Sequence, residues 1–346
     1  MFRVGVTRDL RAEDGSFLFA PAVDLHALES REDVAWGYLS RAEPVLTAPL
    51  LDGLDALLHL TPAVTVDSLA GGSRLALIAR SGVGLDSVDL DACTAAGVAV
   101  TITPEGISRP MASSAVTLIL ALAHRLTDRH DAFRRGAWSE GRAGLIGVGL
   151  AGRVLGLIGF GRIGREVHRL LRPYELRTVV TTRSLDAATA AEHEVEPVDL
   201  DTLLRESDFV VVACPLTPET FHLLDARRLA LMKPTAFLVN VARGAIVDQA
   251  ALVGALESGV IAGAGLDVFE QEPFDPDDGI IRARNVIAAP HALGYTDHLL
   301  QSCIGGACAA ILAVASGEQP DHVVNPEVLT SRVFRDKLVD LASRRF

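Results

Sequence analysis

The chain has 346 residues, of which 49% are hydrophobic and 22% charged, a balance typical of globular proteins with about two domains. Its net charge of −12 argues against a nucleic-acid partner and against an anionic membrane surface. The four cysteines show no CxxC pair and no metal-ligand spacing, and Met1 to Leu10 does not resemble a signal peptide. We therefore expect a cytoplasmic protein without a metal.

The N-terminal part alternates apolar strands with helical stretches, which predicts a parallel sheet. Strands are expected at 2–7, 56–60, 74–79 and 98–102, and helices at 64–70 and 89–96. A loop of small residues, 81–86, follows the third of these strands. Its N–H groups could hold a carboxylate, and an ordinary tight turn is an equal alternative. A break at Thr103 and Pro104 marks the first domain boundary.

A long apolar helix is predicted at 111–124, suited to lie between two domains or across a dimer interface. Arg109 precedes it. The simpler interpretation is a solvated arginine, and the alternative is a group that meets an anionic substrate. Residues 136–152 are rich in glycine and predict an extended segment without regular structure. The apolar stretches 111–123 and 303–315 are too short to span a bilayer comfortably, so both are expected to be buried helices.

A glycine pattern in the middle of the chain predicts a dinucleotide site. The apolar run 154–158 reads as a buried strand, and Gly159, Gly161 and Gly164 follow it in the order G-x-G-x-x-G before a helical pattern. The first glycine permits a tight turn, the second lets a pyrophosphate approach the backbone, and the third lets the helix pack closely. The N–H groups of the helix start can bind phosphate.

The next strand is expected at 176–181, and the residues that follow it distinguish NAD from NADP in proteins of this kind. NAD-binding proteins usually carry an acidic residue there, which accepts hydrogen bonds from the ribose hydroxyls. This chain has Thr182, Arg183 and Ser184 instead. Arg183 could pair with a 2′-phosphate, and the hydroxyls could add hydrogen bonds. The pattern favours NADP over NAD, although Arg183 is alternatively a surface charge or a group that stacks on adenine.

The rest of the chain continues the alternation. Strands are expected at 209–213, 236–241, 265–269 and 286–289, and helices at 200–206, 225–232, 248–258 and 299–316. In parallel sheets, ligands bind at the carboxyl ends of the strands. We expect cofactor contacts at or after these ends from Pro215, Val241 and Gly294.

Three chemically active side chains follow successive strand ends, so they can meet in one cleft: Arg243, Glu272 and His291. An arginine can orient a substrate carboxylate and polarise a carbonyl. A histidine can exchange the hydroxyl proton. A glutamate can hold the histidine's tautomer and stabilise its charged form. Each residue alone has an ordinary structural explanation, but together, beside a cofactor motif, they predict hydride transfer on a 2-hydroxy or 2-oxo acid.

These motifs resemble the D-isomer-specific 2-hydroxyacid dehydrogenases, a family that includes glyoxylate/hydroxypyruvate reductases, phosphoglycerate dehydrogenase and formate dehydrogenase. The matching segments are 81–86, 155–164, 214–220, 232–248, 265–273 and 290–294. Glu272 argues against a formate dehydrogenase, in which a glutamine is expected. The segment 111–114 lacks a Val-Ala-Glu common in relatives.

The resemblance implies a role for each matched residue. Arg243 looks like the substrate arginine, His291 the acid/base, and Glu272 its partner. Val83 and Gly84 look like the family's backbone donors to the substrate carboxylate. Arg162 and Ile163 are similar to its pyrophosphate-binding residues, and Asp267 is similar to the aspartate that binds the nicotinamide carboxamide.

The resemblance also implies an α/β fold with two Rossmann-like domains, in which the nucleotide domain is inserted into a split substrate domain. We expect the substrate domain at 1–104 and 297–346 and the dinucleotide domain at 105–296. The predicted activity is NADPH- or NADH-dependent reduction of a small 2-oxo acid to a D-2-hydroxy acid by a homodimer. Two alternatives stay open: a cofactor-sensing, corepressor-like protein without turnover, and a phosphite-type dehydrogenase. The sequence does not name the substrate.

Overall fold

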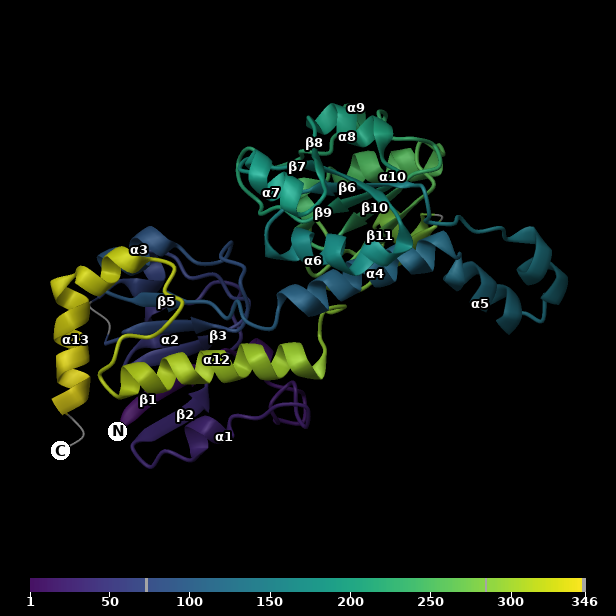
Figure 1. Ribbon diagram of the computed structural model, residues 1–346. Coiled ribbons are helices and arrows are strands. Elements are labelled where there is room, and N and C mark those ends of the chain that lie inside the picture. The colour runs from purple at the N-terminus through teal and green to yellow at the C-terminus, as the bar shows by residue number, and fades with distance from the viewer. Residues whose placement is uncertain (72–73, 284, 344–346) are drawn as a thin grey trace. The chain divides into compact units, whose positions relative to one another are not determined.

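The computed structural model describes residues 1–71, 74–283 and 285–343, and the chain divides into two compact units (Figure 1). Unit 1 comprises residues 1–107 and 295–346, and unit 2 comprises residues 108–294. Each unit has its own parallel sheet. The predicted α/β class with two parallel sheets is confirmed, and the residues of unit 2 interrupt those of unit 1 along the chain.

Unit 1 contains a five-stranded sheet in the order β2-β1-β3-β4-β5, with every pair parallel. Its strands are β1 (Phe2–Val6), β2 (Val34–Tyr38), β3 (Ala56–His59), β4 (Leu77–Arg80) and β5 (Ala99–Thr101). Its helices are α1 (His26–Glu29), α2 (Ala48–Leu51), α3 (Leu90–Ala95), α12 (Asp297–Ala315) and α13 (Arg332–Ser343), with short 3-10 turns η1 (Arg8–Leu10), η2 (Asp67–Leu69) and η6 (Pro326–Thr330).

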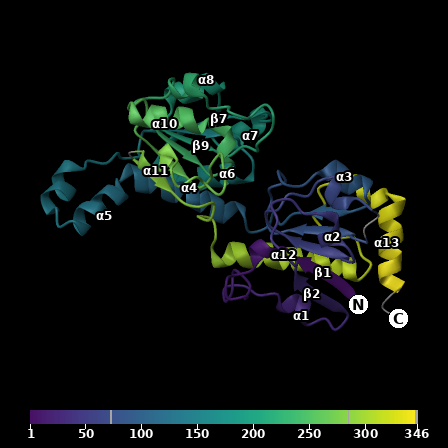
Figure 2. The same cartoon turned by 180° about the vertical axis from the view of Figure 1, so that it is seen from behind.

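Helix α12 runs along this sheet and supplies much of the core of unit 1 (Figures 1 and 2). It has 19 residues, close to the helix predicted at 299–316 and longer than the apolar stretch 303–315. Among the described helices it alone is long and apolar enough to cross a membrane. Its buried side chains, such as Ile304, Ile311 and Val314, pack with strands β1, β3 and β4. Burial in the core thus accounts for its apolar composition.

Unit 2 contains a seven-stranded sheet in the order β12-β11-β10-β9-β6-β7-β8, again with every pair parallel. Its strands are β6 (Val154–Ile158), β7 (Arg177–Thr181), β8 (Glu196–Pro197), β9 (Phe209–Val212), β10 (Phe237–Asn240), β11 (Gly263–Leu266) and β12 (Val286–Ala288). The order reverses between β6 and β9, which is where such sheets bind dinucleotides.

Helices cover both faces of this sheet, so its central strands are continuous apolar runs. Figure 1 shows α4 and α6 on one side and α8 and α10 on the other. The helices are α4 (Ser108–Ala123), α5 (Leu126–Arg134), α6 (Arg162–Leu171), α7 (Ala187–Glu192), α8 (Leu200–Glu206), α9 (Ala226–Leu229), α10 (Gln249–Glu257) and α11 (Gly279–Arg282), with shorter turns η3 (Glu140–Gly144), η4 (Arg172–Tyr174) and η5 (Gly244–Ile246).

Two local expectations were wrong. The helix expected at 64–70 is only the 3-10 turn η2, because the N–H of Val64 bonds to the carbonyl of Ser87 and ties this segment to another loop. The segment 136–152 is not wholly irregular, since Glu140–Gly144 forms a π-helical turn. This turn lies next to α5, which had not been predicted. The two form an arm that projects from the rest of unit 2 in both views (Figures 1 and 2).

Candidate active site

The glycine turn after β6 has the geometry that a bound pyrophosphate needs. Gly159 has φ +101°, and a Cβ there would press on the backbone of Ala213. A Cβ at Gly164 would overlap the carbonyl oxygen of Gly159, so the third glycine lets α6 lie on the turn. At Gly161 a Cβ would meet no atom within 4 Å. Open space therefore lies against the backbone where α6 begins.

The first residues of α6 are Arg162 and Ile163, as the motif requires. Ile163 packs on the core between the sheet and α4, whereas Arg162 is exposed. The N–H groups of this first helical turn have no partner within the helix, and the helix dipole adds positive potential there. These residues fit the phosphates of a dinucleotide.

The turn after β7 carries Thr182, Arg183 and Ser184, of which Arg183 and Ser184 are exposed. The positive charge of Arg183 acts on two residues after β9, Cys214 and Glu219. A hydrogen bond with Thr217 and, to a smaller degree, the Arg183 charge hold the pKa of Glu219 below its ordinary value. Burial raises the pKa of Cys214 to about 11 although Arg183 opposes this. Cys214 is therefore a neutral thiol rather than a nucleophile.

The three predicted catalytic side chains follow neighbouring strands. Arg243 comes after β10, Glu272 after β11 and His291 after β12, and these strands are adjacent in the sheet. The Nδ1 of His291 lies 2.6 Å from Oε2 of Glu272. The other oxygen, Oε1, accepts a hydrogen bond from the N–H of Phe269 at 2.9 Å. With Nδ1 bound to the carboxylate, Nε2 is the nitrogen that can exchange a proton with a substrate.

The carboxylate of Glu272 stays ionised despite partial burial. Burial alone would raise its pKa, but hydrogen bonds from His291 and from the Phe269 N–H, with the charges of His291 and Arg243, hold it below the ordinary value. The positive charge of Arg243 thus helps to stabilise the ionised form of Glu272. Arg243 is half-buried and donates from Nη1 to the carbonyl of Ala242 at 2.7 Å.

A buried aspartate fixes the turn that carries the histidine. Asp267 is 1% exposed, and its Oδ1 accepts hydrogen bonds from the N–H groups of Ala292 and Leu293 at 3.0 and 2.9 Å. Burial raises its pKa, while these two bonds oppose the rise. His291 itself has φ +53°, a left-handed conformation that is uncommon for residues other than glycine. Asp267 holds the backbone directly after this strained residue.

The remaining predicted cofactor positions lie at strand ends of the same sheet. Val241 is buried directly after β10, and Pro215 is exposed in the turn after β9. Gly294 is buried and is the last residue of unit 2. Within the described ranges, no group of three histidine, cysteine or acidic side chains could hold a metal ion.

The predicted substrate loop, residues 81–86, belongs to unit 1. Val83 is 38% exposed and Gly84 is half-buried, in the loop that follows β4. Thr103 fixes the base of the loop, since its hydroxyl accepts from the N–H of Gly82 at 2.8 Å and its own N–H donates to the Gly82 carbonyl. The N–H groups of Val83 and Gly84 therefore sit in an anchored turn at a strand end.

Sequence inspection missed a buried pair below this loop. His59 is fully buried, and its Nδ1 lies 2.8 Å from Nη1 of Arg80, while its Nε2 lies 2.6 Å from the carbonyl oxygen of Pro62. Arg80 also donates to Ser87 at 3.0 Å. Since a guanidinium can only donate, Nδ1 must accept and His59 must be neutral. Burial and the Arg80 charge lower the pKa of His59 to about 4.

Arg109, whose role the sequence left open, forms an ion pair on the surface of unit 2. Its Nη1 lies 2.8 Å from Oε1 of Glu166 on α6, and its side chain is 58% exposed. Arg169 holds both oxygens of the same carboxylate. The exposed side chain agrees with the simpler interpretation, a solvated arginine.

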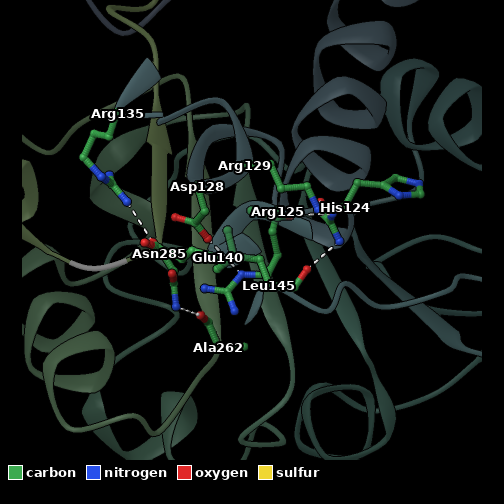
Figure 3. Close-up of polar contacts among 10 residues, drawn as sticks. His124, Arg125, Asp128, Arg129, Arg135, Glu140, Leu145, Ala262 and Asn285 are labelled. Atoms are coloured by element: carbon green, nitrogen blue, oxygen red, sulfur yellow. Dashed lines mark hydrogen bonds and ion pairs between the residues drawn. The ribbon is translucent and has the colours of Figure 1, made fainter. Parts of the chain in front are cut away.

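The arm of unit 2, residues 126–146, is held together by Arg129. This side chain donates to the carbonyls of His124 and Leu145, which Figure 3 labels, and to that of Gly141. The arm exposes large apolar side chains: Leu126, Phe133, Trp138 and Ile146. Beside its base lies a pocket of about 220 Å³, at the amino ends of β10–β12 and therefore away from the catalytic side chains. Its lining combines Leu122, Ile146, Phe237 and Ile287 with Arg125, Asp128 and Asn285.

Comparison with known proteins places the chain among dehydrogenases. Residues 116–292 match the family model of the D-isomer specific 2-hydroxyacid dehydrogenase NAD-binding domain. A glyoxylate reductase of Thermococcus litoralis is 38% identical over 80% of this chain and 86% of its own length. One from Aeropyrum pernix is 39% identical over 79% and 83%, respectively.

Solved structures agree with this placement. The NADPH-dependent glyoxylate/hydroxypyruvate reductase of Sinorhizobium meliloti, in complex with NADP and malonate, superposes with a TM-score of 0.79 at 29% identity. The match covers 94% of this chain and 97% of that one. The family predicted from the motifs is confirmed.

Proposed function

Because this chain belongs to the D-isomer-specific 2-hydroxyacid dehydrogenases, and is an NAD(P)-dependent oxidoreductase of the glyoxylate/hydroxypyruvate reductase type, we propose that its substrate is glyoxylate, hydroxypyruvate or a similarly small 2-oxo acid. The product would be the corresponding D-2-hydroxy acid. The observation that supports the proposal is the 2.6 Å contact between Nδ1 of His291 and Oε2 of Glu272. The positive charge of Arg243 also lowers the pKa of the same carboxylate.

In the proposed mechanism a bound nicotinamide would supply the hydride, and side chains of this protein orient the substrate and transfer the proton. Arg243 orients the substrate carboxylate and polarises the carbonyl. His291 gives a proton from Nε2 to the carbonyl oxygen. Glu272 keeps Nδ1 protonated and stabilises the imidazolium before transfer. Asp267 keeps the turn that carries His291 in place. We propose that Asp267 also contacts the nicotinamide carboxamide.

We further propose that unit 2 is the dinucleotide-binding domain and that unit 1 is the substrate domain. The N–H groups of Val83 and Gly84 would bind the substrate carboxylate. The glycine turn with Arg162 and Ile163 would bind the pyrophosphate, and strand-end residues would line the rest of the cofactor: Pro215, Val241 and Gly294. The open space at Gly161 supports the pyrophosphate position.

The activity is tested by following NADPH and NADH absorbance after addition of glyoxylate or hydroxypyruvate. We expect turnover of both acids by the native protein. Arg243→Ala should lower kcat/KM by roughly 100-fold or more, because an oriented cation at the developing oxyanion is lost. NADPH binding, followed by its fluorescence, should change little. An Arg243→Ala variant with native turnover would remove Arg243 from the mechanism.

We propose NADP as the preferred cofactor, because an exposed arginine stands at the end of β7 where NAD-binding proteins carry a carboxylate. Arg183→Ala should reduce kcat/KM with NADPH about tenfold or more, since a charge-assisted contact to the 2′-phosphate is lost. Its effect with NADH should be small. Arg205→Ala, an exposed arginine on α8, serves as the control for net charge. Equal losses with both cofactors would contradict the assignment.

Two further proposals concern the whole protein. The exposed apolar side chains of the arm support a homodimer in which each arm packs on unit 2 of the partner. The cysteines Cys93, Cys214, Cys303 and Cys308 are free, which supports a reducing, cytoplasmic location.

A further inference from the structure

A second histidine–carboxylate pair lies close in sequence to the catalytic one. The Nε2 of His222 lies 2.7 Å from Oε1 of Glu270, two residues before Glu272. Its Nδ1 lies 4.0 Å from Oδ2 of Asp248. His222 and Glu270 are about one-third exposed, so they are accessible to solvent yet ordered by their partners.

Glu270 is held from several directions. Its own N–H donates to the side-chain oxygen of Gln249 at 3.0 Å, and its Oε2 accepts from the backbone N–H of Gln249 at 3.2 Å. The backbone of His222 is also fixed, because its N–H donates to the carbonyl of Ala245 at 2.8 Å. The pair therefore joins three turns: the one before α9, the one that follows Arg243, and the one that precedes Glu272.

The last two turns touch directly. A Cβ at Gly244 would overlap the backbone of Phe269 and Glu270, so no atom separates the chain after Arg243 from the chain before Glu272. Phe269 also donates its N–H to Oε1 of Glu272. A shift of the Phe269–Glu270 backbone would consequently move Glu272 away from His291.

We propose that His222 and Glu270 form a positioning pair that clamps the Phe269–Glu272 turn onto the Arg243 turn and so keeps Glu272 in register with His291. The pair acts through the backbone of the Phe269–Glu272 turn, which carries Glu272 toward His291. This inference rests on the proposed function, because it assumes that Glu272 and His291 carry the chemistry.

A double-mutant cycle on kcat tests the proposal. His222→Ala should lower kcat about tenfold while KM for the 2-oxo acid changes less than about threefold, since the lost interaction acts on the proton transfer and not on carboxylate binding. His222→Gln, which retains an N–H donor, should recover most of the loss. In a Glu272→Gln background, His222→Ala should cost less than about twofold, because the group that it positions is already impaired.

Arg177→Ala provides the control, since it breaks ion pairs with Glu196 and Glu206 at the start of β7 and should leave kcat unchanged in both backgrounds. Thermal unfolding of each variant separates folding defects from the kinetic effect. Unchanged kcat in His222→Ala, or an equal loss in both backgrounds, would overturn the positioning role alone. Unchanged kcat in Glu272→Gln itself would overturn the proposed chemistry and this inference with it.

Discussion

His59 and Arg80 occupy the last register position between β3 and β4, directly before the loops that follow those strands. The neutral imidazole accepts from the guanidinium on one side and donates to the carbonyl of Pro62 on the other. Protonation would remove the acceptor and place two cations side by side in a buried site. The pair therefore fixes the base of the proposed substrate loop only while His59 is neutral.

Stability should consequently fall in mild acid. The pKa of His59 is lowered from 6.5 to about 4, so the unfolded state binds a proton first as the pH drops. This group's contribution is complete above pH 6.5 and is lost between pH 6.5 and 4, at a cost of about 3 kcal/mol. His168, whose pKa burial also lowers, acts in the same direction.

Thermal unfolding from pH 7.5 to 4.5 measures this dependence. His59→Gln, which can still accept and donate, should flatten the curve relative to the native protein, and His168→Gln should flatten it less. An unaltered pH dependence in His59→Gln would show that another group controls acid sensitivity.

Helix starts in this chain are encoded locally by aspartate. Among the described residues, six helices begin with an aspartate whose carboxylate accepts a hydrogen bond from an N–H of the first turn: Asp89, Asp186, Asp199, Asp225, Asp248 and Asp278. Such caps need only nearby residues, and they agree with the starts predicted for α3, α8, α9 and α10 to within one residue. Short or polar elements carry weaker signals, and the following were not predicted: β2, β8, α1, α2, α5, α7, α11 and α13.

Helix α13 buries Phe334, Leu338 and Leu341 in the core of unit 1, and one lysine adds polar contacts. The Nζ of Lys337 donates to the carbonyls of Leu75, Ala96 and Gly97 at 2.7, 2.9 and 3.1 Å. These bonds join α13 to the end of α3 and to the segment before β4. Lys337→Met keeps an apolar stem of similar length but removes all three bonds. We expect a loss of about 2 kcal/mol in the free energy of unfolding, measured by chemical denaturation.

The control for this change is Arg332→Met on the same helix, whose exposed ion pair with Asp336 should contribute less than about 0.5 kcal/mol. Equal stability of the two variants would show that the carbonyls at the end of α3 are satisfied without Lys337.

At the scale of the whole molecule, the proposed homodimer depends on the apolar side chains of the arm. In a single chain, Phe133 and Trp138 are each 69% exposed to solvent. Light scattering should give the native protein about twice the chain mass of 36.7 kDa. Phe133→Ser combined with Trp138→Ser should shift it to the mass of one chain, because the apolar contact is lost.

Val339→Ser on α13 removes an equally exposed apolar side chain outside the arm and should leave the mass unchanged. A native protein of single-chain mass would contradict the dimer, and a double variant of dimeric mass would exclude the arm as its contact.

The sequence by itself determined the α/β class, the family, the glycine turn after β6 and the placement of Arg243, Glu272 and His291 at strand ends. Each depends on short-range patterns: an apolar run, a glycine spacing, or a polar residue where a strand stops. Parallel strands bring their carboxyl ends to one edge, so local order along the chain already implies proximity.

Only the tertiary structure decided the pairs that join distant segments. His222 lies 48 residues from Glu270, Arg109 lies 57 from Glu166, and Lys337 lies 262 from Leu75. No periodicity or motif selects such partners, because their choice depends on the twist of the sheet and on which turns pack together. The same holds for the neutral state of His59, which comes from burial among residues that are not its neighbours in the chain.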